Sequence, residues 1–117
     1  NEVMLWAIIE SPTAVANIDE ILEVEGIDAV GFGHQDYSLR AGISDENSAD
    51  VHAAREKVFE ATQRHGKLMW WNAAQPEPML EQFRRGIRMG LLSVDVIQFD
   101  NLLRGLAGGI KKGLGSE

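Results

Sequence analysis

Two acidic residues follow the two segments of this chain that most resemble buried strands. Glu10 comes directly after the apolar segment 5–9, and Asp36 comes directly after the segment 29–35. An amphipathic helical segment, 11–25, separates them, so we predict a β-α-β unit with an acid at the carboxyl end of each strand. Ligands bind at those ends in parallel α/β folds. Two carboxylates at one edge suit a divalent cation such as Mg²⁺, which takes one or two carboxylates and fills its other positions with water and substrate oxygens.

Each of these residues also has a simpler interpretation. Glu10 precedes a helix and could be an acid favoured by the helix dipole, and the residues alone slightly favour that reading. Asp36 could belong to an Asx-turn. His34, beside Asp36, could be a solvated loop histidine or could act directly in a site. Asp95 could cap the last helix or contact a ligand.

Composition narrows the classes of partner. The chain has 117 residues, a formal net charge of −7 and no cysteine. The negative charge argues against nucleic acid and anionic membranes as main partners. The lack of cysteine removes disulfides and zinc-thiolate sites, and together with the lack of a signal peptide or membrane-length apolar run it leads us to expect a cytoplasmic protein. The first residue is Asn1 and a strand follows within a few residues, which we interpret as a cut start.

Apolar periodicity and helix-boundary residues predict about four consecutive βα units in one domain, 1–117. Such a series forms either a barrel or an open doubly wound sheet, and a complete (β/α)₈ barrel needs roughly 250 residues. Trp70 and Trp71 alternate along the third strand, so one should enter the core and the other should point to the opposite face. We expect strands at 3–9, 27–33, 67–71 and 89–94, helices at 11–25, 48–66, 75–86 and 97–112, an irregular polar loop at 34–47, and a frayed tail at 113–117.

Two segments carry a resemblance to a known family. Segment 8–21, IIESPTAVANIDEI, resembles the "IET-x-x-A-x-x-N-I-x-x-I" segment of the HpcH/HpaI aldolase/citrate lyase family. Segment 26–38, GIDAVGFGHQDYS, resembles its "GVDG-x-x-x-GPxDLS" segment, and Ser93-Val94-Asp95 is similar to its later "GVD". The likeness extends over about residues 3–105, and the two motifs occur in the family's order and separation.

The resemblance implies an α/β fold, the C-terminal half of a phosphoenolpyruvate/pyruvate-type TIM barrel containing strands five to eight. It implies a metal-dependent carbon–carbon lyase, a class II aldolase that joins or separates a 2-oxo acid such as pyruvate and an aldehyde. Glu10 and Asp36 would then bind Mg²⁺ or Mn²⁺, and both carboxylates should reach one cation. Gly33, Gln35, Asp36 and Asn72 would contact substrate, with backbone N–H groups near Gln35 and Asp36 meeting the pyruvate carboxylate. The acid/base residue would come from the first half of the barrel.

The chain departs from the family pattern near this site. Ile8 replaces a frequent glutamine, His34 replaces the proline, and Tyr37 replaces the leucine. Segment 70–72, Trp-Trp-Asn, stands where relatives carry small apolar residues. These changes bear on the substrate more than on the metal. An acyl-CoA lyase of the citrate-lyase type and a non-catalytic fragment or binding module are the alternatives.

Assembly is also expected from the sequence. The first and fourth strands would be apolar edges in an isolated half barrel, without the charges or prolines that usually protect edges. We therefore expect a homo-oligomer, or pairing with the missing half barrel.

Overall fold

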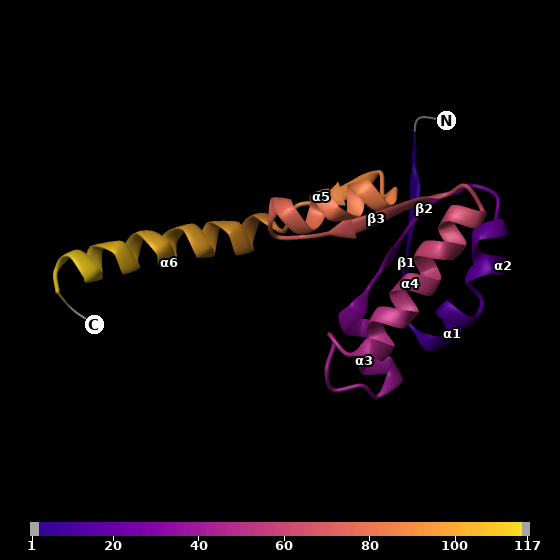
Figure 1. Cartoon of the computed structure of the whole chain (residues 1–117), viewed down its shortest axis with the longest axis horizontal. Coiled ribbons are helices and arrows are strands. Elements are labelled where there is room, and N and C mark those ends of the chain that lie inside the picture. Colours follow the sequence, from indigo (N-terminus) through magenta and orange to yellow (C-terminus); the bar gives the residue numbers. More distant parts are fainter. Residues whose placement is uncertain (1–2, 116–117) are drawn as a thin grey trace.

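Strands and helices alternate along the chain and build one parallel sheet with helices packed on it (Figure 1). The computed structural model describes residues 3–115. The strand order β1-β2-β3-β4 follows the sequence, as right-handed βα crossovers produce. The elements are β1 (Leu5–Ile9), α1 (Pro12–Ala16), α2 (Ile18–Glu23), β2 (Ile27–Phe32), α3 (His34–Ala41), α4 (Ala49–Arg64), β3 (Leu68–Asn72), α5 (Pro76–Arg85), β4 (Met89–Leu91) and α6 (Asp95–Gly113).

Helix boundaries follow local chemistry that the sequence shows directly. The Ser11 hydroxyl accepts a hydrogen bond from the Ala14 N–H, and Ser48 caps α4 in the same way. Gly86 ends α5 with a left-handed φ of 108°, a conformation that costs glycine nothing. These three predicted boundaries are confirmed.

The core lies between the sheet and the helices α1, α2 and α4. Alternate residues of each strand point to this side, which we call the outer face. Thr62 is also buried there and donates its hydroxyl to the Val58 carbonyl within α4. Val51, Ala54, Val58 and Ala61, which recur at helical spacing in the sequence, point into this core from α4. The buried apolar residues include Ile9, Val15, Ile18, Leu22, Val30, Phe32, Val51, Ala54, Val58, Ala61 and Met69.

The opposite, inner face of the sheet is uncovered by the residues that the structure describes. Trp6 and Ile8 of β1 point to this face and are 50% and 55% exposed. The next residue, Ile9, points to the outer face and is only 2% exposed. In a complete (β/α)₈ barrel this face would point to the barrel centre and be filled by side chains of the other strands.

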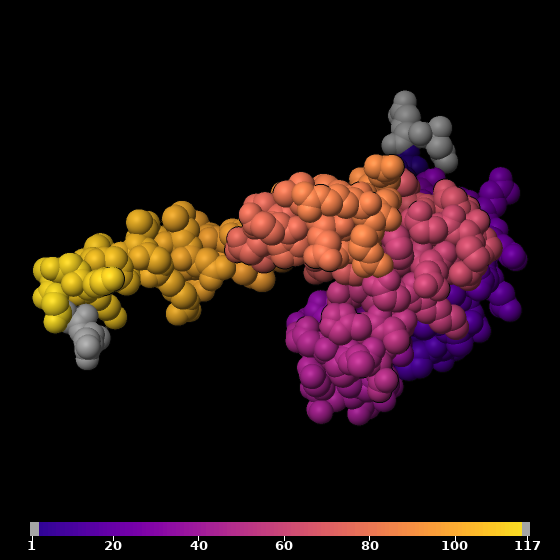
Figure 2. Space-filling model, viewed as in Figure 1, coloured from indigo at the N-terminus to yellow at the C-terminus, as the bar shows by residue number. Residues whose placement is uncertain are grey.

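Helix α6 extends away from the sheet as an arm (Figures 1 and 2). None of its residues, 95–113, is buried, although the helix carries apolar side chains such as Phe99, Leu103 and Ile110. No helix in the described part of the chain is both long enough and apolar enough to cross a membrane.

Several predicted boundaries were wrong. Segment 34–47 is not wholly irregular, because α3 starts directly after β2. The predicted helix 11–25 divides at Asn17, which ends α1 and begins α2. The fourth strand stops at Leu91 rather than residue 94, since Ser93 has a φ of 100° that a strand cannot include. Helix α6 continues through Gly113, the first residue of the predicted frayed tail; residues 116 and 117 of that tail lie outside the described part.

Candidate active site

A cavity of about 180 Å³ opens at the carboxyl ends of β1, β2 and β3. We call it the strand-end cavity. It brings together every residue for which the sequence predicted a metal or substrate role: Glu10, Gly33, Gln35, Asp36 and Asn72. Ile8, Phe32, His34 and Trp70 complete its lining.

Glu10 is held close to the backbone of the neighbouring strand. The Gly33 N–H donates to the Ile9 carbonyl at 2.9 Å, which continues the β1–β2 ladder to the edge of the cavity. A Cβ atom on Gly33 would lie 3.1 Å from the Glu10 Cβ and 3.5 Å from Glu10 Oε2. Glycine at this position therefore leaves the space in which the Glu10 carboxylate reaches the cavity.

Asp36 lies in the first turn of α3, a helix that the sequence did not predict. Its side chain is exposed and lines the strand-end cavity together with Gln35. The first N–H groups of a helix have no acceptor within the helix, and the helix dipole favours negative charge there. The start of α3 can therefore hold a carboxylate at the cavity through backbone N–H groups, including those of Gln35 and Asp36.

Arg40 is a charged neighbour of the site that the sequence reasoning missed. Its Nη2 donates to Glu10 Oε1 at 3.3 Å, and both side chains are partly exposed. Arg40 lies four residues after Asp36, so the helix places it one turn away on a similar face. That spacing would have found it had segment 34–41 been predicted as helical.

The donor set fits a divalent cation. Glu10 supplies a carboxylate just after β1 and Asp36 supplies one from the first turn of α3, and Gly33 leaves the space that a side chain would fill. Residues 3–115 contain no group of three or more His, Asp or Glu side chains arranged to hold a metal. Mg²⁺ needs only one or two carboxylates when substrate and water supply the other oxygens.

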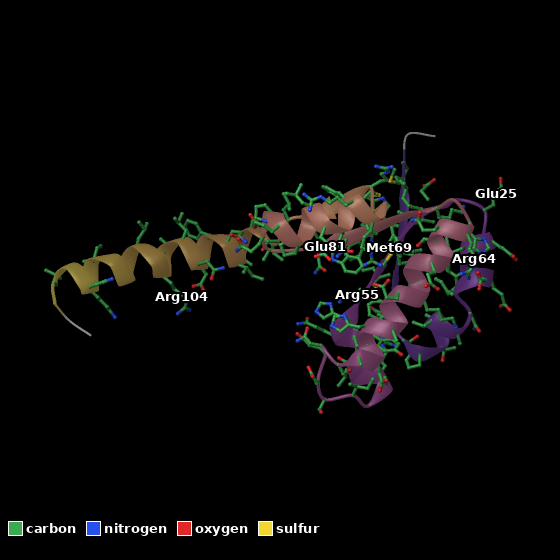
Figure 3. The ribbon with its side chains drawn as sticks, viewed as in Figure 1. Glu25, Arg55, Arg64, Met69, Glu81 and Arg104 are labelled. Atoms are coloured by element: carbon green, nitrogen blue, oxygen red, sulfur yellow. The ribbon has the colours of Figure 1, made fainter. Side chains whose placement is uncertain are left out.

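His34 lines the cavity and also lies near the charged side chains of Glu46 and Arg55. Its Nε2 is 4.0 Å from Glu46 Oε1, and its side chain is partly buried. Burial lowers the pKa of His34, and the positive Arg55 lowers it further. Arg55 projects from α4 and is labelled in Figure 3. Its guanidinium lies over the rings of Phe32 at 5.6 Å and Trp71 at 4.8 Å. Burial also lowers the pKa of Arg55.

The two adjacent tryptophans separate as the alternation predicted. Trp71 packs against the core on the outer face. Trp70 points to the inner face and forms part of the cavity lining. The prediction that one would enter the core and the other would face the opposite side is confirmed.

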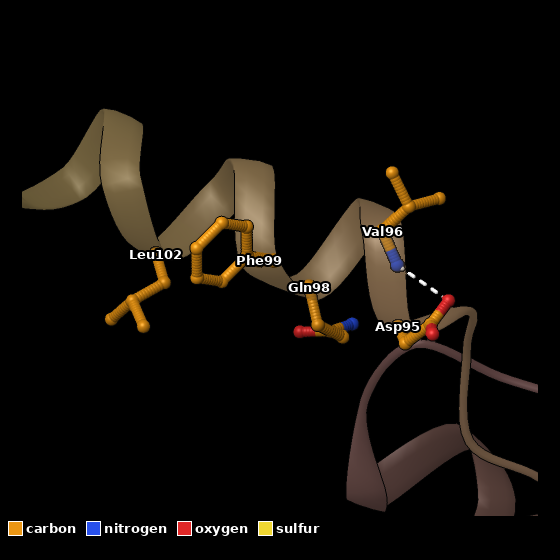
Figure 4. Close-up of a pocket in the computed structure, with 5 residues that line it drawn as sticks. All are labelled: Asp95, Val96, Gln98, Phe99 and Leu102. Atoms are coloured by element: carbon orange, nitrogen blue, oxygen red, sulfur yellow. Dashed lines mark hydrogen bonds between the residues drawn. The ribbon is translucent and has the colours of Figure 1, made fainter.

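A second hollow lies at the start of α6, lined by Asp95, Val96, Gln98, Phe99 and Leu102 (Figure 4). The Asp95 carboxylate accepts a hydrogen bond from the Val96 N–H at 2.7 Å. This hollow offers one carboxylate on an otherwise mainly apolar surface, and that carboxylate is already engaged at its own helix start. The pair of carboxylates makes the strand-end cavity the better candidate for chemistry.

Known proteins resemble this chain in sequence and in fold. A 2-keto-3-deoxy-L-rhamnonate aldolase of Escherichia coli (strain K12) is 31% identical over 99 residues, which cover 81% of this chain and 36% of the relative. The HpcH/HpaI aldolase from Desulfitobacterium hafniense DCB-2 is 35% identical, with a TM-score of 0.84 over 94% of this chain and 43% of that chain. Macrophomate synthase shares the fold, with a TM-score of 0.88, 24% identity, and coverage of 97% of this chain and 40% of that chain.

These relatives define the architecture. The chain is an α/β fold corresponding to part of their TIM barrels, and it spans about 36% of the length of the curated relatives it matches. Residues 1–99 match the sequence profile of the family described as HpcH/HpaI aldolase/citrate lyase. The chain therefore belongs to the HpcH/HpaI aldolase/citrate lyase family.

Proposed function

We propose that residues of the strand-end cavity form the metal-binding half of an aldolase active site that acts on a 2-oxo acid. The observation that supports this most is the convergence of Glu10, Gly33 and Asp36 on one cavity at the strand ends of an aldolase-family fold. The acceptor or product on the other side of the carbon–carbon bond would be an aldehyde, as the names of the aldolase relatives suggest.

Each cavity residue has a distinct role in this proposal. Glu10 and Asp36 hold Mg²⁺ or Mn²⁺, and such a cation supplies a Lewis acid that stabilises negative charge on a keto oxygen. The N–H groups at the start of α3 bind the carboxylate of the 2-oxo acid. The amide of Asn72 closes the third side of the cavity and can hydrogen-bond to the substrate. Arg40 keeps the Glu10 carboxylate oriented.

The proposed reaction in the cleavage direction breaks the bond between C3 and C4 of a 4-hydroxy-2-oxo acid. The C4 hydroxyl loses its proton and becomes the aldehyde carbonyl. The electron pair of the broken bond stays on the 2-oxo acid fragment as an enolate, which then takes a proton at C3. None of the cavity side chains is assigned the proton transfers, which we place on residues from the preceding strands of the barrel.

Assay of the natural protein that carries this sequence tests the proposal. Pyruvate and a short aldehyde, with Mn²⁺ present, should give a 4-hydroxy-2-oxo acid, and a chelator should abolish its formation. Glu10→Gln and Asp36→Asn should each lower kcat/KM by about 100-fold or more. Glu25→Gln, a change to an exposed glutamate far from the cavity, is the matched control. Undiminished turnover after chelation, or in both site variants, would refute the proposal.

A citrate-lyase-type reaction on an acyl-CoA is the second candidate, because the family description includes citrate lyase. The same carboxylate pair would serve it. Its distinguishing result is cleavage of a 3-hydroxyacyl-CoA with no turnover of free 4-hydroxy-2-oxo acids.

We also propose that the protein works as an assembly. Helix α6 exposes apolar residues along its whole length, and an apolar groove between α5 and the start of α6 is lined by Met79, Leu80, Phe83 and Leu92. An isolated 19-residue helix of this kind gains little from propensity alone and needs a packing partner. A second copy of the chain, or the first half of the barrel, would supply it.

A further inference from the structure

The indole of Trp70 lies directly over Gly31 on the inner face of the sheet. A Cβ atom on Gly31 would be 1.8 Å from Trp70 Cε2 and 2.4 Å from Trp70 Nε1. Any residue with a side chain at position 31 would force the ring to shift. Glycine at 31 and tryptophan at 70 are therefore fitted to each other, because the ring can approach β2 this closely only where residue 31 has no side chain.

Strand register places this ring just below the predicted metal ligands. Ile8 pairs with Gly31, and the β2–β3 register, continued by one residue from Val30 and Met69, puts Trp70 at the same level. Glu10, Gly33 and Asn72 lie two residues further along their strands. Side chains inside a barrel stack in such levels. The indole therefore forms a floor under the carboxylates.

The floor has an unused hydrogen-bond donor. Trp70 Nε1 is buried and has no hydrogen-bond partner among the residues that the structure describes. A buried N–H without an acceptor costs roughly 1–3 kcal/mol, so such groups are uncommon. This donor lies against Gly31 on the inner face and is not accessible to solvent.

Trp71, the neighbouring tryptophan, does not share the position of Trp70 on the inner face. Trp71 packs against the core and under the Arg55 guanidinium, where a large side chain is simply part of the outer layer. Trp70 instead lines a cavity of about 180 Å³.

We propose that Trp70 is the residue that limits the size of the acceptor aldehyde, so that the site takes short aldehydes of two or three carbons and rejects longer ones. The inference rests on the proposed aldolase function. The ring occupies the depth into which a longer acceptor would otherwise extend, and Gly31 keeps it there.

Acceptor competition in the natural protein that carries this sequence tests the inference. Glycolaldehyde and a six-carbon aldehyde are each offered with pyruvate and Mn²⁺. Trp70→Ala should raise kcat/KM for the long acceptor relative to glycolaldehyde by about tenfold or more, the size of effect that a few methylene groups produce in a pocket. Trp70→Phe, which keeps a smaller floor, should give an intermediate ratio. Trp71→Ala, the matched control on the outer face, should leave the ratio within about twofold of the wild type.

Gly31→Ala provides an independent test of the fitted pair. Its Cβ must displace the indole towards the cavity, so turnover of both acceptors should fall. The double variant Gly31→Ala, Trp70→Ala should recover most of that loss. Additive losses in the double variant would contradict the close fit.

Exchange of the C3 protons of pyruvate with solvent, followed by NMR, reports enolate formation without any acceptor. It therefore distinguishes failure of the Trp70 inference from failure of the aldolase proposal. Exchange with an unchanged acceptor ratio in Trp70→Ala and Trp70→Phe would overturn the role of Trp70 and leave the aldolase proposal intact. Neither exchange nor aldol product in the wild-type protein would overturn both. If Trp70→Ala does not fold, the ratios in Trp70→Phe and in the Gly31 variants decide the matter.

Discussion

The two faces of the four-stranded sheet have opposite properties. The outer face is covered by α1, α2 and α4, and Val30 on this face and Ile18 of α2 are both fully buried in the core between them. The inner face exposes Trp6 and Ile8 and carries the strand-end cavity. Adjacent residues of one strand thus differ: the outer ones stabilise the fold, and the inner ones line the candidate site or remain exposed.

This difference explains why a continuous apolar strand gave an incomplete prediction. The run 3–9 predicts burial on both faces, which is typical of parallel sheets. Within residues 3–115 that expectation is met at Ile9 on the outer face, whereas Trp6 and Ile8 on the inner face stay exposed. We expect further strands of a barrel to cover the inner face. We therefore expect other parts of a barrel to pack against the apolar inner residues.

The largest effect that the comparison predicts concerns two adjacent isoleucines. In the 117-residue chain at low concentration, Ile9→Ala should lower the free energy of unfolding by about 2–5 kcal/mol, because it leaves a cavity in the covered layer. Ile8→Ala should cost under about 1 kcal/mol, because that side chain is 55% exposed. Urea denaturation measures both. Equal costs for the two variants would show that the inner face is covered as well.

Association of the chain should depend on the same exposed face. Exposed apolar patches of this extent mark interfaces, and β1 and β4 are unprotected edges. We expect self-association at low micromolar concentration in sedimentation velocity, and Ile8→Lys should shift the chain by at least about tenfold in concentration towards monomer. A strictly monomeric wild-type chain with a sharp thermal transition would contradict this expectation.

Gly33→Ala should have a moderate effect confined to the site. The added Cβ would lie 3.1 Å from the Glu10 Cβ and 3.2 Å from the Ile8 Cγ2, so the Glu10 side chain must shift by a few tenths of an ångström. We expect about fivefold weaker Mn²⁺ binding, equivalent to about 1 kcal/mol, with little change in unfolding. Calorimetric titration measures the affinity. Gly105→Ala, on α6, where an added Cβ would meet nothing within 4 Å, serves as the control, and an equal loss of affinity there would contradict a local effect.

The smallest effect concerns a surface charge group on the outer face. Arg64 donates to the Asp19 carboxylate at 2.8 Å, and this bond, with that of His65, lowers the pKa of Asp19 below its ordinary value of 3.8. Because the folded pKa is the lower one, the stabilisation is present above about pH 4 and is lost as the pH falls through the folded pKa. Asp19→Asn should therefore be slightly less stable than wild type at pH 6 and should match it near pH 2. A difference that persists at the acid end would contradict this account.

The sequence predicted the parts of the fold whose cause is local. Ser48 and Gly86 mark helix ends through their own chemistry, and the spacing of Val51 and Val58 identifies the inward side of α4. Helix α3 was missed because only Ser38 in it is buried, so it lacks an apolar period that a sequence can display. The length of β4 was missed because Ser93 adopts a backbone conformation that serine seldom takes.

The candidate site also has parts that the sequence predicts and parts that it does not. That Glu10 and Asp36 line one cavity could be predicted, because each follows a strand and the carboxyl ends of parallel strands meet at one edge of the sheet. Arg40 was missed because its contact with Glu10 depends on α3. The fit of Trp70 over Gly31 depends on the register between β2 and β3, which no property of either residue reveals in isolation.

Direct measurement of Mn²⁺ binding tests the central claim that the inner edge of the sheet holds a divalent cation between Glu10 and Asp36. Electron paramagnetic resonance counts free Mn²⁺ in titrations of the natural protein and its Glu10→Gln, Asp36→Asn and Glu25→Gln variants. The account predicts one bound ion per chain, at least about tenfold weaker binding in each of the first two variants, and unchanged binding in the third. Equal affinity in all four proteins, or no bound Mn²⁺ in the wild type, would contradict it.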